Sequence, residues 1–497
     1  MSRKKPIVYN ALLLTAVNLL LRFASTSFQV YLSGKIGAAG IGLLQLVLSV
    51  GSLAITFGMG GIRTATMYLC AEVVGQKRVE NMGWVLSGCI RYSLLLSLAA
   101  GTVLYCFSPK IAVLWIGDMS TVNAIRLLAC LIPINCLCGV MVGHYTGMNR
   151  IGTLAAVEVG EQILTMVVTI LLINYWAGQD SYRACQAVIM AGGMGTCFTL
   201  ILLLLRKQKE FSRIRNRISV RKKLIETAVP LAIADDAKIG INTIENLMVP
   251  KRLALFAGEV APLAAFGTVC GMVFPVLMFP AAILFALAEL LIPEMARCNA
   301  AGSTQRIGHL AERSFLMATI FGFFCGGILF LNADHLCLAL YKSTSAGEYL
   351  RMFALLAPML YCDAIVDAMT KGLGQQKICV RYNILTSAMD VALLFILLPE
   401  YGMTGYFISF FITHLINFIL SLRLLLKLVG KILSFKVWIL CAAATSISMI
   451  AARFVHNPWI GCIAFLIIFI SLLILIGVIG RKDIRWFKGL LFPAATD

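Results

Sequence analysis

Long apolar segments dominate this sequence and restrict the chain to very few architectures. The 497 residues are 60% hydrophobic and 13% charged, with a mean hydropathy of +0.90, whereas a soluble domain is typically about one quarter charged. In lipid, backbone amides must find their hydrogen bonds within the chain, so segments of about 20 apolar residues cross as helices. We therefore predict an all-α integral membrane protein with about 14 transmembrane helices.

Hydropathy and breaker residues place these helices along the whole chain. The predicted spans lie near 8–32, 40–72, 84–107, 122–146, 152–174, 184–205, 224–249, 262–293, 314–331, 349–370, 379–398, 403–426, 437–455 and 459–480.

The first twelve spans form two sets of six that resemble each other. The segment IRLLACLIPINC (125–136) is similar to LRMFALLAPMLY (350–361). The offset in numbering that aligns these segments also pairs glycines elsewhere in the two sets, Gly42 with Gly267 and Gly147 with Gly372. An even number of spans separates equivalent residues, so the repeats have the same orientation in the membrane. We expect two parallel six-helix repeats around a central cavity, followed by two C-terminal helices.

The repeat and the basic connections suggest the domain boundaries. We predict an N-lobe at 1–206, a basic cytoplasmic linker at 207–223, a C-lobe at 224–428, and the last two helices with a tail at 429–497.

The basic residues behind the net charge of +19 are concentrated in short connections between spans. This distribution indicates that they set the orientation of the spans in the membrane rather than bind nucleic acid. We expect a multi-pass protein of the bacterial cytoplasmic membrane. By the positive-inside rule, the N-terminus, Arg150, the linker and the C-terminal tail face the cytoplasm. Lys251 and Arg252 are the one exception. We also expect the linker to contact membrane lipids, the chain to be a monomer, and its sixteen cysteines to be free thiols, because no CxxC or Cys/His metal spacing occurs.

Charged residues inside the spans carry the functional signal. Each costs at least about 2.5–3.5 kcal/mol at bilayer depth, so such residues normally face a bundle interior or a water-filled cavity. In the first span, five polar residues share one helical face: Thr15, Asn18, Arg22, Ser25 and Gln29. In the seventh span, so do Asp235, Lys238, Asn242 and Glu245. These are the first helices of the two repeats, so symmetry places the two faces on opposite walls of one cavity.

Internal pairing is the alternative to cavity lining. Asp235 and Lys238 are i, i+3 neighbours and could neutralise each other. Arg22 and Arg63 have no acidic residue within a turn, which favours a position on the cavity wall. Arg126 and Arg351, near the outer ends of their helices, are interpreted as structural anchors. The acidic pair Glu158 and Glu161 is compatible with either role.

Several segments resemble one transporter superfamily. They are IGAAGIGLLQLV (36–47), the stretch ending at Ala71-Glu72, NTIENLMVPKRL (242–253) and FPAAILFALAELLIPEMA (279–296). In order and spacing they are similar to the multidrug/oligosaccharidyl-lipid/polysaccharide exporter superfamily. The similarity is greatest to its polysaccharide-transporter branch, which contains stage V sporulation protein B and is related to lipid II flippases.

This resemblance implies outward flipping of undecaprenyl-diphosphate-linked sugars by alternating access. It implies that Arg22 meets the lipid diphosphate, and that Glu245, Asn242 and Asn383 occupy polar positions of the family, Asn383 near a cation site. This sequence departs from the family where Gln29 replaces a second basic residue and where Arg63 follows Gly61-Ile62 in place of a proline.

The first hypothesis is therefore a flippase of an anionic lipid-linked oligosaccharide for cell-wall, spore or surface polysaccharide. The expected substrate-binding residues are Arg22, Arg63, Asn18, Ser25, Gln29 and Lys238. Coupling to Na⁺ or H⁺ is expected at Glu245, Asn242, Asp235, Asn383 and Asp390, with no resident cofactor or metal.

The alternative is a cation-coupled multidrug or metabolite antiporter of the same superfamily, favoured by the acidic residues of the second repeat. A membrane glycosyltransferase is disfavoured because the outer connections are short and lack paired carboxylates. A transport-inert scaffold is a further alternative.

Overall fold

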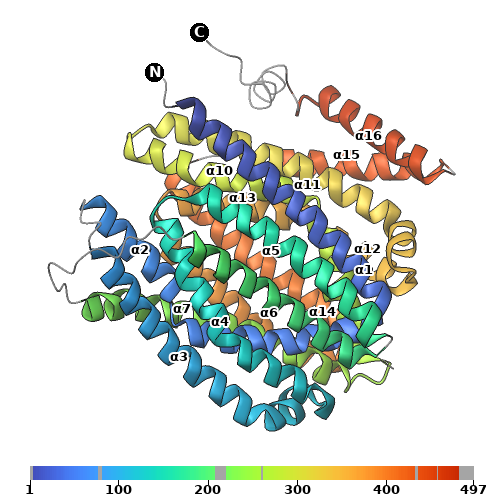
Figure 1. The fold of residues 1–497 in the computed structure, drawn as a ribbon. Coiled ribbons are helices and arrows are strands. Elements are labelled where there is room, and N and C mark those ends of the chain that lie inside the picture. Colours follow the sequence, from blue (N-terminus) through green and yellow to red (C-terminus); the bar gives the residue numbers. More distant parts are fainter. Residues whose placement is uncertain are drawn as a thin grey trace. The chain divides into compact units, whose positions relative to one another are not determined.

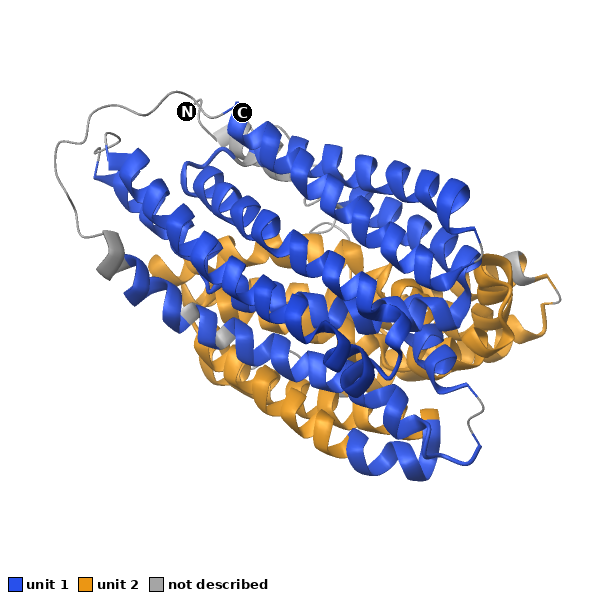
Figure 2. Ribbon diagram, turned by 60° about the horizontal axis from the view of Figure 1, so that its bottom comes forward, with its two compact units in different colours: residues 1–271, 394–402 blue, residues 272–393, 403–497 orange. Residues whose placement is uncertain are grey.

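The computed structural model describes residues 4–76, 81–178, 180–206, 220–258, 261–430, 435–455, 457–478 and 480. Over these ranges the secondary structure is helical, without a strand, which confirms the predicted fold class. The chain divides into two compact units, coloured separately in Figure 2: residues 1–271 with 394–402, and residues 272–393 with 403–497.

Unit 1 contains the first eight α-helices, of which the first seven are labelled in Figure 1. They are α1 (Lys4–Met59), α2 (Ile62–Gly75), α3 (Met82–Ile111), α4 (Val122–Gly147), α5 (Ile151–Leu172), α6 (Ser181–Leu205), α7 (Val220–Leu253) and α8 (Pro262–Thr268). Short π or 3₁₀ turns, η2 (Ala112–Ile116), η3 (Met119–Thr121) and η4 (Ile173–Ala177), extend the ends of α3 and α5 and precede α4.

Unit 2 contains the remaining α-helices, except for residues 394–402 of α14, which belong to unit 1. They are α9 (Phe274–Met278), α10 (Ala281–Ala300), α11 (Thr304–Tyr341), α12 (Thr344–Ala354), α13 (Ala357–Gly372), α14 (Gln376–Val429), α15 (Phe435–Arg453) and α16 (Pro458–Leu475). A π turn, η5 (Val269–Val273), joins α8 to α9.

Two long helices are each interrupted at a glycine that lies between two predicted spans, although the span predicted at 40–72 continues past the end of α1 into α2. Gly37 interrupts α1 with a φ of 70°, and Gly402 interrupts α14 with a φ of 58°. Glycine adopts positive φ without the steric penalty of a Cβ, so it marks these junctions in the sequence. The predicted boundaries between spans 8–32 and 40–72, and between 379–398 and 403–426, fall at these breaks.

The number of spans agrees approximately with the prediction of fourteen. Eight of the described helices are long and apolar enough to cross a membrane, and two bent pairs raise this to ten. The division of α1 and α14 adds two more. The charge-rich α7 and the short α16 account for the other two predicted spans.

Helix packing repeats at the same offset that relates the two sets of spans in the sequence. A Cβ on Gly101 would lie 2.9 Å from the carbonyl oxygen of Ala129, and a Cβ on the equivalent Gly326 would lie 2.9 Å from that of Ala354. The same close approach of two helix backbones therefore occurs once in each unit, between α3 and α4 and between α11 and α12.

A second pair of equivalent glycines behaves in the same way. A Cβ on Gly147 would lie 2.6 Å from the carbonyl oxygen of Met67, and a Cβ on Gly372 would lie 2.7 Å from that of Ile292. The two partners are again equivalent positions of the sequence repeat. The two glycines lie at the C-terminal ends of α4 and α13. Together with the contacts at Ala129 and Ala354, they show that α4 and its equivalent, α12 with α13, are closely packed toward both ends.

The compact units do not coincide with the predicted lobes, because α7 packs with α1 in unit 1. Thr243 Oγ1 of α7 donates to the Ser49 carbonyl oxygen at 3.2 Å, and Asn246 Nδ2 donates to Ser49 Oγ at 3.0 Å. The lobes at 1–206 and 224–428, which the repeat defines, stay a prediction. Of the predicted linker 207–223, residues 207–219 lie outside the described residues, as does the tail 481–497.

The predicted anchoring arginines contact the helix before their own. Arg126 Nε donates to Ser108 Oγ at 3.2 Å, and its guanidinium lies 5.3 Å from the Tyr105 ring centroid. Arg351 forms an ion pair with Asp334 of α11. These contacts confirm the interpretation of both arginines as structural anchors.

Lys251 and Arg252, the exceptions to the positive-inside rule, also make contacts with neighbouring helices. Lys251 Nζ donates to the Leu114 carbonyl oxygen, and the Arg252 guanidinium stacks 3.2 Å from the centroid of the Phe395 ring. Stacking on an aromatic face suits the weakly hydrated guanidinium, which gives this arginine a structural role.

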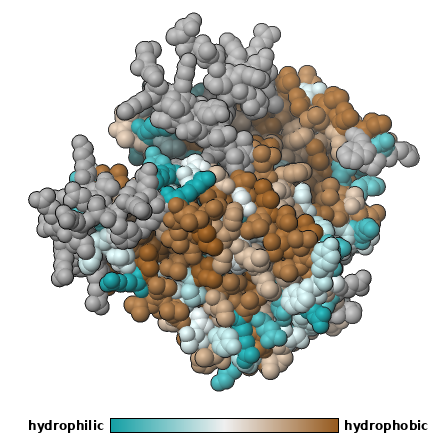
Figure 3. Space-filling view, viewed as in Figure 1, coloured by the Kyte–Doolittle hydropathy of each residue, from teal (hydrophilic) through white to brown (hydrophobic). Residues whose placement is uncertain are grey.

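Apolar side chains cover much of the surface of the described residues, as Figure 3 shows for one face. Leu95 is 73% exposed, Ile396 62% and Ile244 55%. Such extensive apolar exposure is typical of a lipid-facing surface. All sixteen cysteines are free and most are buried, which confirms the predicted thiols.

Candidate functional site

A break between α1 and α2 positions Arg63. Gly60 and Gly61 have φ values of 48° and 69°, and a Cβ on Gly61 would collide with the Ala228 carbonyl oxygen of α7. Only glycine permits this conformation together with this approach. Non-helical backbone within a membrane-length segment is tolerated where it is covered by protein or lines a cavity. Arg63 lies in the first turn after the break, at the positive end of α2.

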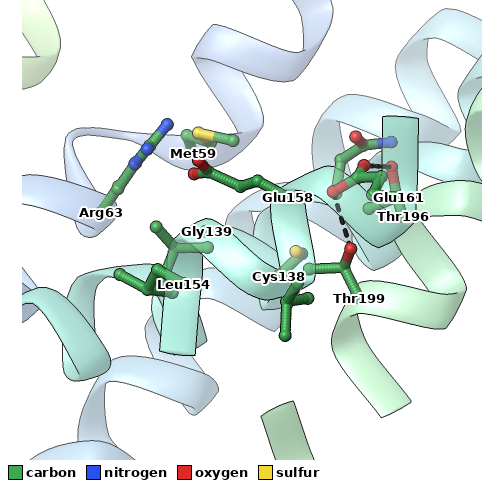
Figure 4. A pocket seen from close by; sticks show the side chains of 12 residues that line it. Met59, Arg63, Cys138, Gly139, Leu154, Glu158, Glu161, Thr196 and Thr199 are labelled. Carbon is green, nitrogen blue, oxygen red and sulfur yellow. Dashed lines mark hydrogen bonds between the residues drawn. The ribbon is translucent and has the colours of Figure 1, made fainter. Parts of the chain in front are cut away.

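Arg63 lines a cavity of about 190 Å³ within unit 1. This volume corresponds to roughly six water molecules in the liquid. Four helices and the end of α1 supply the wall, part of which is shown in Figure 4. The lining residues are Met59 and Arg63 at the α1–α2 break; Asn135, Cys138, Gly139 and Val142 of α4; Leu154, Val157, Glu158 and Glu161 of α5; and Thr196 and Thr199 of α6.

Glu161 is fixed at one wall by two hydroxyl groups of α6. Thr199 Oγ1 donates to Oε2 at 2.6 Å and Thr196 Oγ1 donates to Oε1 at 3.3 Å. A Cβ on Gly195 would lie 2.2 Å from Thr165 Oγ1, so glycine also allows α5 and α6 to approach closely here. The carboxylate is therefore held in one orientation by neutral donors.

Glu158 lies one turn before Glu161 on the same face of α5 and is exposed. In Figure 4 its side chain extends toward the side of the cavity that carries Arg63 and Met59. The structure records no ion pair between Arg63 and either glutamate in the part of the chain it describes. One guanidinium and two carboxylates thus line the cavity, and its formal charge is negative.

The predicted stripe on α1 is partly occupied by helix contacts. Ser25 Oγ accepts a hydrogen bond from Gln162 Nε2 at 3.1 Å, and Gln29 Nε2 donates to the Gly271 carbonyl oxygen at 3.3 Å. Arg22 is exposed. The side chain of Asn18 lies outside the described residues. Contacts between α1 and its neighbours therefore account for part of this stripe, and its role in substrate binding stays a prediction.

On α7, Asp235 and Lys238 are exposed, whereas Asn242 and Glu245 are half-buried. Among the described residues the structure records no ion pair between Asp235 and Lys238, so it does not support the alternative in which they neutralise each other. Substrate binding by Lys238 and cation coupling by the other three residues stay predictions.

Asp390 in unit 2 is 5% exposed and has two hydroxyl partners on the second half of α14. Ser409 Oγ donates to its Oδ1 at 2.6 Å, and Thr413 Oγ1 donates to the same atom at 3.2 Å. The side chain of Asn383 is half-buried. Sequence reasoning missed Ser409 and Thr413, although their i, i+4 spacing is visible, because it does not reveal which helix faces them.

The other acids of unit 2 have different surroundings. Asp363 Oδ2 accepts from Asn417 Nδ2 at 3.1 Å, and Asp367 forms an ion pair with Lys371 at 2.5 Å. The predicted coupling residues Asp235, Asn242 and Glu245 belong to unit 1, while Asn383 and Asp390 belong to unit 2. A single cation site formed by all five is therefore not assigned.

Repeated membrane-length helices with a charged cavity among them define a multi-pass membrane transporter rather than an enzyme. The chain belongs to the MatE family, whose sequence profile matches residues 15–176 and 253–396. It is thereby a member of the multidrug/oligosaccharidyl-lipid/polysaccharide exporter superfamily, as the sequence segments predict.

Two relatives in sequence are sporulation proteins of one bacterium. The chain is 22% identical to stage V sporulation protein B of Bacillus subtilis (strain 168) over 510 residues, covering 97% of this chain and 98% of that protein. It is 22% identical to sporulation protein YkvU of the same organism over 288 residues, covering 54% of this chain and 62% of that one.

Two solved structures share the fold. The lipid II flippase MurJ in an inward closed conformation has a TM-score of 0.70 at 12% identity, covering 93% of this chain and 98% of that one. An inward-facing multidrug resistance MATE family transporter has a TM-score of 0.63 at 16% identity, covering 89% and 100%. Both likenesses concern the fold alone.

Proposed function

We propose that this chain flips an undecaprenyl-diphosphate-linked oligosaccharide outward across the cytoplasmic membrane by alternating access. The observation that carries the proposal is Arg63, a guanidinium set at a helix break inside a cavity of unit 1. The end-to-end similarity to stage V sporulation protein B and the fold shared with a lipid II flippase support a lipid-linked substrate.

The physical chemistry of a diphosphate suits this arrangement. A guanidinium binds two phosphate oxygens at once through parallel N–H groups, and that contact is strongest where water is scarce. Arg22, exposed on α1, is proposed as a second cationic contact. With the cell interior negative, a headgroup of two negative charges gains roughly 4–5 kcal/mol per 100 mV on leaving.

Lipid binding to the purified protein tests the proposal. In native mass spectrometry we expect the wild type to retain an undecaprenyl-diphosphate-linked sugar in preference to phosphatidylglycerol. Arg63→Ala is expected to weaken retention at least tenfold, because a charged hydrogen-bonded contact contributes about 1.5–3 kcal/mol. Arg183→Ala is the matched control, because this surface arginine lies outside the cavity and pairs with Asp180. Equal retention by wild type and Arg63→Ala would contradict the anion site.

The second candidate is a cation-coupled antiporter. The observation that favours it is Asp390, a buried carboxylate with two hydroxyl partners in unit 2, since such hard oxygen groups suit Na⁺ or H⁺. Efflux of a cationic dye from proteoliposomes, driven by a Na⁺ or proton gradient and lost in Asp390→Asn, would favour this function, provided that no sugar-lipid is retained.

A further inference from the structure

The cavity of unit 1 contains more negative charge than a site for a diphosphate alone requires. Glu158 and Glu161 both line it, together with a single Arg63. Two carboxylates repel a diphosphate, and within apolar helices the repulsion is screened less than in water. A ligand that fits this wall must bring positive charge of its own.

We propose that this cavity selects a lipid-linked sugar that carries a protonated amino group, which Glu161 and Glu158 bind while Arg63 contacts the diphosphate. The inference rests on the proposed function and names the class of headgroup that this same site accepts. It assigns Glu158 and Glu161 a role that the sequence leaves open.

Glu161 has the capacity for such a ligand. A carboxylate offers about four lone-pair sites, and the hydroxyl groups of Thr196 and Thr199 occupy two of them. Because both donors are neutral, the negative charge remains to attract an ammonium group. The hydroxyl groups also fix the carboxylate before the ligand arrives, which reduces the entropy lost on binding.

The opening and the volume of the cavity are also compatible with an amino-sugar headgroup. Arg63 and Glu158 are exposed while Glu161 is half-buried, so the cavity is open on the side of the first two residues. Its volume of about 190 Å³ is of the size that a single sugar ring needs. In a 2-amino-2-deoxy sugar 1-diphosphate, the ammonium and the diphosphate sit on neighbouring ring carbons. One ring therefore presents both charges within the same small cavity, where Arg63 and the two glutamates are also gathered.

Two matched lipids test the inference: undecaprenyl-diphosphate-linked glucosamine, and the same lipid with an N-acetylated amine. They differ by one positive charge and one acetyl group. We expect the wild type to bind the free-amine lipid about tenfold more tightly, because a charge-assisted contact is made only with that form. Affinities would be measured by native mass spectrometry titration in one detergent.

Variants separate recognition from packing. Glu161→Gln removes the charge and keeps one oxygen, which can still accept from Thr199, while its amide NH2 group replaces the oxygen that accepts from Thr196. It is therefore expected to abolish the preference, and to bind the N-acetyl lipid at least as tightly as the wild type does, because it removes a charge that repels the diphosphate. Glu312→Gln, an exposed acid of α11 in unit 2, is the matched control and should keep the preference. If Glu161→Gln does not fold, the exposed Glu158→Gln provides the same comparison.

The outcomes distinguish the inference from the proposed function. A wild type that binds both lipids equally, or a Glu161→Gln variant that keeps the preference, overturns the amine site and leaves the flippase proposal standing. A wild type that binds neither lipid better than phosphatidylglycerol overturns the proposed function itself.

Discussion

At the scale of single residues, two carboxylates of this protein each accept hydrogen bonds from two neutral hydroxyl groups. Glu161 has Thr196 and Thr199, and Asp390 has Ser409 and Thr413. A full ion pair would cancel the charge, whereas hydroxyl donors solvate the carboxylate and leave its field available to a mobile cation or an ammonium group.

The effect of removing these donors can be predicted. Ser409→Ala takes away the 2.6 Å partner of a buried carboxylate and is expected to lower the free energy of unfolding by about 1–3 kcal/mol. Asp390→Asn should be milder, because an amide oxygen still accepts from both hydroxyl groups. Thermal unfolding in detergent measures both variants, and a larger loss for Asp390→Asn than for Ser409→Ala would contradict this account.

These pairs also show what sequence can predict about the site. The charge of Arg63 within an apolar span indicates a cavity, because lipid offers it no partner. The contacts of Glu161 come from α6, some 35 to 38 residues further along the chain. Periodicity sorts residues onto faces of one helix, but it does not indicate which faces of two helices meet. The contacts across helices therefore required the structure.

At the scale of the elements, close helix approach at glycine repeats through the chain. Gly101 lies against Ala129 in unit 1, and Gly326 lies against Ala354 in unit 2. In membranes, small residues let helix backbones approach and gain van der Waals contact where no hydrophobic force drives association. The sequence repeat pairs Gly101 with Gly326 and Ala129 with Ala354, and the structure shows that each glycine is needed for the same close contact between helices.

Enlarging either glycine should separate its helix pair. We expect Gly101→Val and Gly326→Val each to destabilise the protein by about 1–3 kcal/mol, as overpacking does in tight interiors. Gly192→Ala in α6 is the control, since a Cβ there meets nothing within 4 Å. Midpoints of thermal unfolding in detergent would be compared, and a glycine variant as stable as the control would show that the approach is not restrictive.

At the scale of the whole molecule, a reciprocal contact relates the two repeats. A Cβ on Gly42 of α1 would collide with the Leu263 carbonyl oxygen of α8, and a Cβ on Gly267 of α8 would collide with that of Ala38 of α1. Each partner is the equivalent of the other in the sequence repeat. Such exchange of partners is the signature of a local two-fold relation between α1 and α8, both of which belong to unit 1.

The orientation of the spans that the positive-inside rule predicts can be tested by chemical labelling. If basic connections face the cytoplasm, Arg150, between α4 and α5, lies inside and Ser120, between α3 and α4, lies outside. The exposed native thiols Cys106 and Cys130 would first be replaced by alanine. We then expect a membrane-impermeant maleimide to label Ser120→Cys in intact cells, and Arg150→Cys only after the membrane is permeabilised. The reverse pattern would place the N-terminus outside, and the membrane potential would then oppose rather than assist export of an anionic headgroup.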